Sequence, residues 1–102
     1  MAIIEVSVNP IGTGSTSVSS FVARAVKVLE KEKGIKYELT PMGTIVEGDL
    51  GRLLNLVRKM HESAFQAGAM RAVTLLKIDD RRDKTSTMHS KLASLKKHLE
   101  SR

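Results

Sequence analysis

The chain has 102 residues, no cysteine and a formal net charge of +6 at pH 7. This length is that of a single domain, residues 1–102, of a size at which exposed apolar faces are often covered by self-association. The lack of cysteine excludes disulfides, thiolate metal sites and a thiol nucleophile. No apolar run approaches the roughly 20 residues of a membrane span, and no basic segment precedes an apolar one at the N-terminus. We therefore expect a cytoplasmic domain with no membrane partner.

The positive charge is confined to the second half of the chain. Residues 1–51 carry five Lys+Arg and six Asp+Glu, and residues 52–102 carry the other twelve and five, so the net charges are −1 and +7. Such a bias suits nucleic acid or a phosphorylated ligand. Because the charges are spread over two predicted helices and a loop, a solvated face is the favoured interpretation.

The first third of the chain predicts a strand, a turn of small residues and a helix. Residues 2–10 alternate between an apolar face and a mixed face that includes Glu5 and Asn9. Residues 11–17 supply hydroxyl groups, Ser17 among them, that can cap a helix over residues 17–33. Gly34 ends this helix.

Residues 37–49 are the segment on which the rest of the prediction depends. They indicate two short strands joined by a turn at Pro41-Met42-Gly43, followed by Asp49 as the N-cap of a second helix. The proline keeps Thr40 extended, and Gly43 can take a backbone angle that other residues avoid. We therefore expect a tight bend whose backbone is open to a ligand.

The second half predicts a helix, a strand and a final helix. A helix over residues 49–67 has a stripe that we expect to be buried, made of Leu50, Leu53, Leu54, Val57, Met60, Ala64 and Phe65. A strand over residues 71–79 has one face with Ala72, Thr74, Leu76 and Ile78, and another with Val73, Leu75, Lys77 and Asp79. A helix over residues 87–101 carries a narrow apolar seam that packs on the chain's own sheet or on another subunit: Met88, Leu92, Leu95 and Leu99.

The element order β-α-β-β-α-β with an added C-terminal helix predicts an α+β, ferredoxin-like fold with a four-stranded antiparallel sheet. Right-handed crossovers place the first two helices on one face of that sheet. The opposite face is left bare and carries Ile3, Val73 and Leu75, an unfavourable apolar patch in water. We therefore expect the chain to associate through this face, the last helix, or both, as a homo-oligomer that is either a dimer or a tetramer.

Three blocks of the sequence resemble the small thiamine-binding proteins of ferredoxin-like fold, long catalogued as proteins of unknown function. In the family's order, they are Pro10-Ile-Gly-Thr-Gly-Ser-Thr-Ser17 with Val18-Ser-Ser20, Tyr37-Glu-Leu-Thr-Pro-Met-Gly-Thr-Ile-Val-Glu-Gly-Asp49, and Leu76-Lys-Ile-Asp-Asp-Arg-Arg-Asp83. The resemblance runs nearly end to end. It implies binding of thiamine or its hydroxymethyl-pyrimidine portion, no established catalysis, and dimers that pair into tetramers.

The candidate ligand-binding residues are Glu5, Asn9, Ser17, Met42, Gly43 and Thr44. We expect hydrogen bonds from the Thr44 hydroxyl and the backbone of the turn, with Asn9 or Glu5 as a further polar partner. Met42 would pack on the ring of the ligand. Thiamine has a cationic thiazolium that a chain of net charge +6 does not attract, so its neutral pyrimidine half is the predicted anchor.

Two carboxylates have more than one predicted role. Glu5 lies in a central strand, where burial is costly unless a cation or a ligand donor meets the charge. Lys77, on the same face of the neighbouring predicted strand, is the structural partner, and an aminopyrimidine is the functional one. Glu47, near the end of the third strand, can play either part.

The remaining motifs favour structural roles. The serines after Gly14 lack the Gly-x-Ser-x-Gly setting of a nucleophile, so capping is the favoured role, although an anion could sit at that helix end. His61 is expected to be a hydrogen-bonded histidine at the core edge, and His89 and His98 fall on opposite faces of one helix. Asp79, Asp80 and Asp83 are interleaved with Arg81 and Arg82, and the nearly cancelling charges predict salt bridges at the exit of the strand. We therefore predict no catalytic residue, no metal site and no cofactor.

Three classes of function remain. The first is non-catalytic binding of thiamine or its pyrimidine. The second is a nucleic-acid module of the same topology, which needs aromatic residues on the first and third strands. The aromatic residues are Phe21, Tyr37 and Phe65, on neither strand, so we expect no nucleic-acid partner. The third, our alternative to the first, is a regulatory oligomeric module that senses another small metabolite or anion at a subunit interface.

Overall fold

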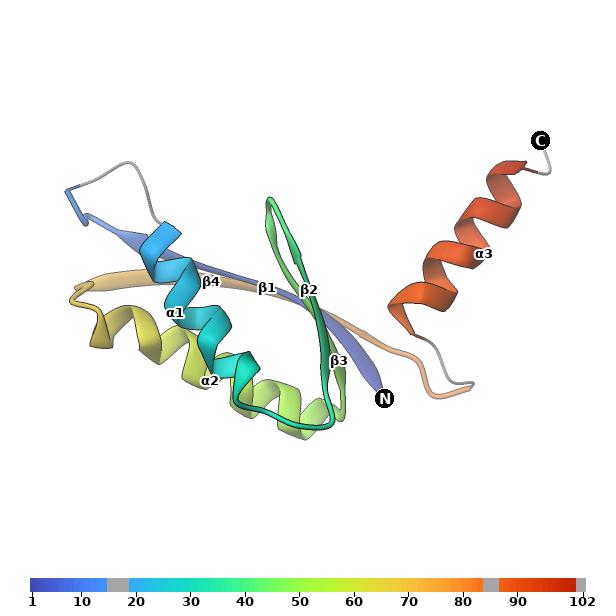
Figure 1. Cartoon of the computed structure of the whole chain (residues 1–102), viewed down its shortest axis with the longest axis horizontal. Coiled ribbons are helices and arrows are strands. Elements are labelled where there is room, and N and C mark those ends of the chain that lie inside the picture. The colour runs from blue at the N-terminus through green and yellow to red at the C-terminus, as the bar shows by residue number, and fades with distance from the viewer. Residues whose placement is uncertain (15–18, 84–86, 101–102) are drawn as a thin grey trace.

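A computed structural model describes residues 1–14, 19–83 and 87–100, and it has the expected ferredoxin-like order with an added helix (Figure 1). The elements are β1 Ala2–Ile11, α1 Ser19–Glu30, β2 Lys36–Thr40, β3 Gly43–Gly48, α2 Leu50–Gln66, β4 Arg71–Asp80 and α3 Met88–Glu100. The four strands form an antiparallel sheet in the order β2-β3-β1-β4. The prediction of an α+β, ferredoxin-like fold is confirmed.

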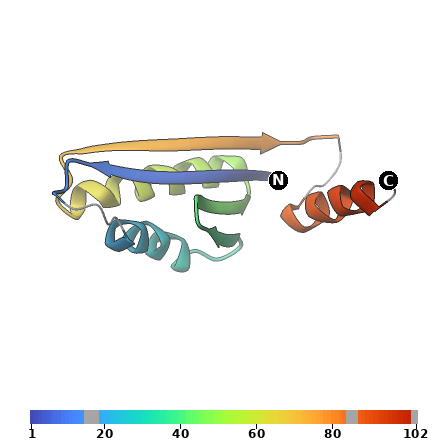
Figure 2. The ribbon, with the colours of Figure 1, turned by 90° about the horizontal axis from the view of Figure 1, so that it is seen from above.

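The helices α1 and α2 pack together on one side of β1 and β4, and α3 lies beyond the end of β1 that carries the N-terminus (Figure 2). The helix-covered face of β1 contributes alternate residues to the core because strand side chains point to opposite faces in turn. The largest fully buried side chains are Ile4, Val6, Leu29, Val46, Leu53, Leu56 and Met60. No helix in the described ranges is long and apolar enough to cross a membrane.

The second helix begins and ends at the residues that the sequence indicates. The Asp49 side chain is the N-cap and accepts a hydrogen bond from the backbone N–H of Arg52 at 3.1 Å, which satisfies one of the free donors at the helix start. Gly68, with φ of 103°, follows the last turn. The α2 helix is thereby fixed between the hairpin and β4.

The predicted buried stripe of α2 is partly wrong. Leu53, Val57 and Met60 are buried as expected, but Leu54 and Phe65 are exposed. The helix is rotated so that Leu56 enters the core, and the side with Leu54 and Phe65 faces out beside β4. The apolar stripe of α2 is therefore wider than the part of it that is buried within one copy of the chain.

The face of the sheet opposite α1 and α2 is called here the bare face. Its residues follow from the register, because side chains directly opposite each other in an antiparallel ladder share a face. They include Ile3, Glu5, Ser7 and Asn9 of β1, Ile45 and Glu47 of β3, and Val73, Leu75, Lys77 and Asp79 of β4. In the described part of α3 only Met88 is buried, so the seam at Leu92, Leu95 and Leu99 is not packed on the chain's own sheet.

Candidate functional site

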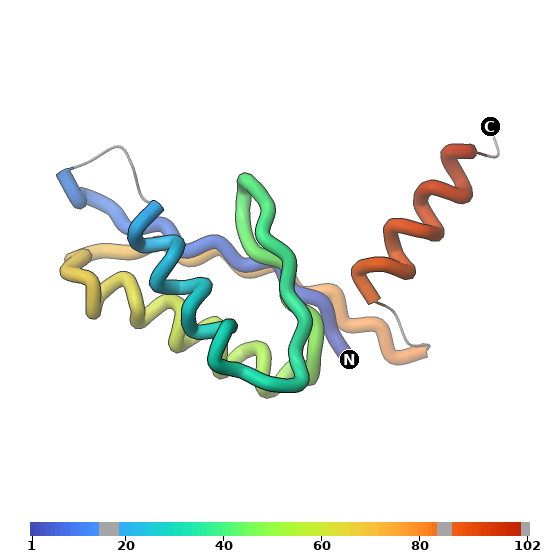
Figure 3. The backbone as a smooth tube through the Cα atoms, viewed as in Figure 1, coloured from blue at the N-terminus to red at the C-terminus, as the bar shows by residue number. Residues whose placement is uncertain are grey.

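The turn between β2 and β3 is held by the side chain of Thr40. Its hydroxyl donates to the carbonyl oxygen of Gly43 at 2.8 Å and accepts from the backbone N–H groups of Met42 and Gly43 at 3.3 and 3.1 Å. Pro41, which has no N–H, sets the backbone on the first side of the bend. These bonds fix a compact tip that extends past β1 (Figure 3).

Gly43 is required at this tip for a different reason from the predicted one. Its φ is not positive, since among the described glycines only Gly12, Gly14, Gly34 and Gly68 have positive values. A Cβ at Gly43 would instead lie 3.0 Å from the carbonyl oxygen of Val6. The absence of a side chain therefore allows the hairpin to approach the backbone of β1 closely.

The hairpin and β1 separate from each other just beyond Gly43. The β1–β3 register runs from Ala2, opposite Gly48, to Val6, opposite Thr44, and ends there. From Ser7 onward, β1 continues without β3 beside it, so residues of both faces of β1 border the opening. An exposed strand edge of this kind offers main-chain donors and acceptors to a ligand.

This opening is a cavity of about 300 Å³, called here the hairpin cavity. Its walls come from β1, the hairpin, α1 and α2, and no residue that lines it is ionisable. They are Val6, Ser7, Val8, Asn9, Val22, Ala25, Leu39, Thr40, Pro41, Met42, Gly43, Thr44 and Met60. A mostly apolar concave site with a few polar groups is the usual form of a small-molecule site.

Two side chains supply most of the polarity of the hairpin cavity. Thr44 is only 5% exposed, and its hydroxyl makes no hydrogen bond within the described residues. The Asn9 amide nitrogen donates to the Ser7 hydroxyl at 2.7 Å and to the Val73 carbonyl at 3.1 Å, which fixes the orientation of the amide. A ligand that enters the cavity meets a hydroxyl and an oriented amide against apolar walls.

The structure brings together four of the six predicted binding residues: Asn9, Met42, Gly43 and Thr44 all line the hairpin cavity. Glu5 does not, because it lies on the bare face opposite Ile45, whereas Thr44 pairs with Val6 on the helix-covered face. Ser17 lies outside the described residues. The sequence offered Glu5 and Asn9 as alternatives beside Thr44, and only Asn9 shares its cavity.

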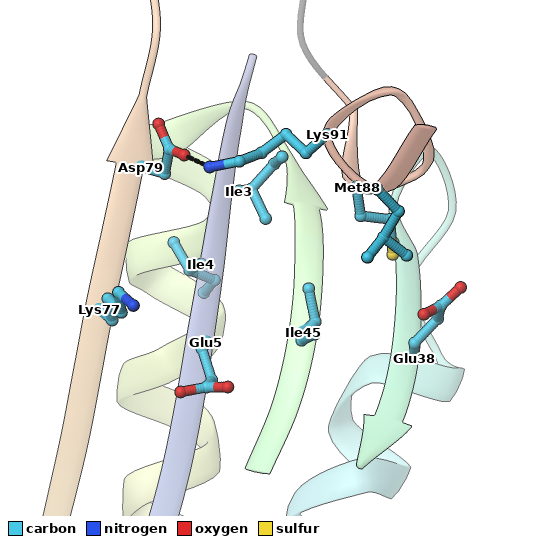
Figure 4. Close-up of a pocket in the computed structure, with 10 residues that line it drawn as sticks. Ile3, Ile4, Glu5, Glu38, Ile45, Lys77, Asp79, Met88 and Lys91 are labelled. Atoms are coloured by element: carbon cyan, nitrogen blue, oxygen red, sulfur yellow. Dashed lines mark hydrogen bonds and ion pairs between the residues drawn. The ribbon is translucent and has the colours of Figure 1, made fainter. Parts of the chain in front are cut away.

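Glu5 lines a second hollow of about 240 Å³, called here the α3 cavity, between the bare face and the first turn of α3 (Figure 4). Its polar lining is charged: Glu5, Glu38, Lys77, Asp79 and Lys91. Glu5 and Lys77 are opposite each other in the register, as the sequence indicated. Although both residues are described, they form no ion pair, and Lys91 pairs with Asp79 instead.

Glu47 has a role that the sequence left open. It is 2% exposed, and its carboxylate oxygen Oε2 accepts from the backbone N–H of Met88 at 3.0 Å, 41 residues away in the chain. A carboxylate at the start of a helix binds free N–H groups and favours the helix dipole. Glu47 therefore docks the N-terminus of α3 onto the sheet. No local sequence pattern could reveal this, because the partners meet only through the tertiary fold.

The predicted structural roles of His61 and of the β4 exit are confirmed. His61 Nδ1 lies 2.7 Å from the Thr74 hydroxyl at the edge of the core. Arg81 pairs with Asp83 and Arg82 with Asp80, and the hydrogen bond that each arginine donates to its aspartate raises the pKa of that arginine above the ordinary value. Within the ranges that the structure describes, no three potential ligands form a metal site.

The sequence matches a known protein family over most of its length. The model of the thiamine-binding protein family matches residues 4–96. The chain belongs to this family. UPF0045 protein YqgV of Bacillus subtilis is 48% identical over 98% of this chain and 99% of its own length. The family's name describes binding and not catalysis.

Solved structures of similar proteins share the fold of this family member. MJ1052 of Methanocaldococcus jannaschii has a TM-score of 0.85 at 37% identity, over 92% of this chain and 94% of that one. A Thermotoga maritima protein named for thiamine biosynthesis/salvage has a TM-score of 0.77 at 24% identity, over 92% and 97%. At that identity the second likeness supports the fold alone.

Proposed function

We propose that the protein binds thiamine, or its hydroxymethyl-pyrimidine portion, without catalysing a reaction, and that the pyrimidine occupies the hairpin cavity. The observation that carries the proposal is the Thr44 hydroxyl, which belongs to a residue only 5% exposed, lines the cavity and makes no hydrogen bond to the described part of the protein. Among the described residues no buried side-chain oxygen lacks a partner, so this hydroxyl is open to the cavity, and a ligand can bond to it without breaking a bond within the protein. The family match supports the class of ligand.

The chemistry of the cavity favours the pyrimidine half over the thiazolium half of the ligand. The lining contains no carboxylate that could meet a cation, and it has apolar walls that suit a flat neutral ring. The aminopyrimidine edge has both donors and acceptors, which match the hydroxyl of Thr44 and the amide of Asn9. Exposed Met42 at the tip offers a flexible thioether to one ring face.

The test is calorimetric titration of wild type and Thr44→Val with thiamine and with free hydroxymethyl-pyrimidine. Valine keeps the shape of threonine and deletes one hydrogen bond, worth about 0.5–1.5 kcal/mol, so both compounds should bind about twofold to tenfold more weakly. Thr74→Val is the matched control, because it removes the same hydroxyl outside the cavity. Equal binding by wild type and Thr44→Val would remove Thr44 from the site, and no binding by either protein would refute the proposal.

We also propose that the protein functions as a homo-oligomer. The bare face carries Ile3, Val73 and Leu75, and the α3 seam leaves Leu95 and Leu99 more than half exposed. Burial of such surface in a second copy is favourable by about 25 cal/mol per Å² of apolar area. Sedimentation at micromolar concentration tests this, with a monomer as the contradicting result.

A further inference from the structure

The side-chain amide of Asn9 is held in one orientation by its neighbours. Its nitrogen Nδ2 lies 3.1 Å from the carbonyl oxygen of Val73, 3.3 Å from the carbonyl oxygen of Ser7 and 2.7 Å from the Ser7 hydroxyl. A backbone carbonyl only accepts hydrogen bonds, so the group that faces both carbonyls is the NH2 group and not the amide oxygen. A flipped amide would lose these bonds and place its oxygen against two other oxygens.

The opposite edge of the Asn9 amide has no partner. Its oxygen Oδ1 makes no hydrogen bond within the described residues. Asn9 is half-buried, and in the part of the chain that the structure describes no buried side-chain oxygen lacks a partner, so Oδ1 is accessible. Val73 lies on β4, and the hairpin lies on the other side of β1, so the edge of the amide that carries Oδ1 is turned away from β4. Because Asn9 lines the hairpin cavity, this oxygen is an acceptor available to a ligand there.

The two polar side chains Asn9 and Thr44 therefore differ in the hydrogen bonds that they can form with a ligand. The Thr44 hydroxyl can rotate, and it can either donate or accept. The Asn9 amide has its nitrogen engaged within the protein, so it offers an acceptor alone. A ligand group opposite Thr44 can consequently be a donor or an acceptor, whereas a group opposite Asn9 has to be a donor.

We propose that Asn9 determines the specificity of the hairpin cavity: its fixed Oδ1 accepts a hydrogen bond from the exocyclic amino group of the pyrimidine, so the protein selects the aminated ring over its deaminated form. In the deaminated form a carbonyl oxygen replaces the amino group, and two acceptors would then face each other. Ser7 is a positioning residue, because its hydroxyl and its carbonyl hold the amide nitrogen. This inference rests on the function proposed above, and it adds which form of the ring the site accepts.

Titration of the wild-type protein with hydroxymethyl-pyrimidine and with its deaminated, oxo analogue tests the selectivity. The oxo analogue should bind about 5-fold to 150-fold more weakly, which is the factor expected when a hydrogen-bonding group is left opposite a polar group that it cannot pair with. Equal affinities for the two compounds would overturn this inference and leave the proposed function standing. Binding of neither compound would overturn both.

The variant Asn9→Leu tests whether the amide is the source of the selectivity, because leucine has a similar shape and no polar side-chain atom. It should weaken binding of the amino compound and bring the ratio of the two dissociation constants close to one. Asn55→Leu is the matched control: it makes the same substitution on α2, outside the cavity, and should leave the ratio at its wild-type value. A wild-type ratio in Asn9→Leu would overturn the proposal.

The variant Ser7→Ala tests the positioning of the amide without removing its acceptor. It deletes the hydroxyl that accepts from Asn9 at 2.7 Å and leaves both backbone carbonyls in place. Because the amide is then held less firmly, the ratio should fall to a value between those of wild type and Asn9→Leu, with tighter binding of the oxo analogue than in wild type. If Asn9→Leu does not fold, Ser7→Ala decides alone, and an unchanged ratio would refute the proposal.

Discussion

The close approach of the hairpin to β1 makes Gly43→Ala the sharpest test of the structure around the cavity. The added Cβ would lie 3.0 Å from the Val6 carbonyl oxygen and 3.5 Å from Cγ of Glu5. The oxygen is main-chain and sits in a central strand, so it cannot rotate away as a side chain would. Since the φ of Gly43 is not positive, alanine adds no backbone strain, and the expected cost is purely steric.

Overpacking of this kind typically costs about 1–3 kcal/mol. For a domain of this size each kcal/mol lowers the melting temperature by about 4–8 °C, so Gly43→Ala should melt at least about 4 °C below wild type in calorimetry at matched protein concentration. Gly51→Ala is the control with the same added atom. In α2 its Cβ meets only Asp49 Oδ2 at 3.4 Å, and alanine favours a helix by up to about 1 kcal/mol, so it should raise the melting temperature. Equal melting temperatures for wild type and Gly43→Ala would show that the hairpin moves freely and that the contact is not restrictive.

Two other predictions concern α3. Glu47→Ala removes the acceptor of the Met88 N–H and should detach the first turn of α3, at a cost of about 1 kcal/mol. Amide hydrogen exchange at residues 88–91 should then become faster. Unchanged exchange would mean that Glu47 does not hold the helix. Leu95→Asp places a charge in the α3 seam and should lower the sedimenting mass of the oligomer. An unchanged mass and stability would exclude the seam from any packing contact.

The order of elements and the faces of β4 were predictable because they depend on local periodicity. The alternation of residues 71–79 predicted correctly that Thr74, Leu76 and Ile78 share one face and Leu75 and Lys77 the other. The sequence also predicted correctly that His61 makes a hydrogen bond at the edge of the core. These features rest on spacing within one element and need no knowledge of its neighbours.

Features that depend on how elements meet were not predictable. The sequence placed Thr44 beside either Glu5 or Asn9, and only the register of β1 with β3 puts Thr44 and Glu5 on opposite faces. The contact of Glu47 with Met88 joins distant segments. The sequence suggested that Gly43 takes a backbone angle that other residues avoid, and this was wrong: its φ is not positive, and the missing side chain instead allows close contact with β1.

The central claim is that the hairpin cavity, and not the α3 cavity, holds the pyrimidine. Amide chemical-shift mapping during titration of the protein with free hydroxymethyl-pyrimidine tests it most directly, because the two cavities involve different residues. Binding in the hairpin cavity predicts saturable shifts at Asn9, Gly43 and Thr44 and small ones at Lys77 and Lys91. Shifts concentrated at Lys77 and Lys91, or no saturable shift at any residue, would contradict it.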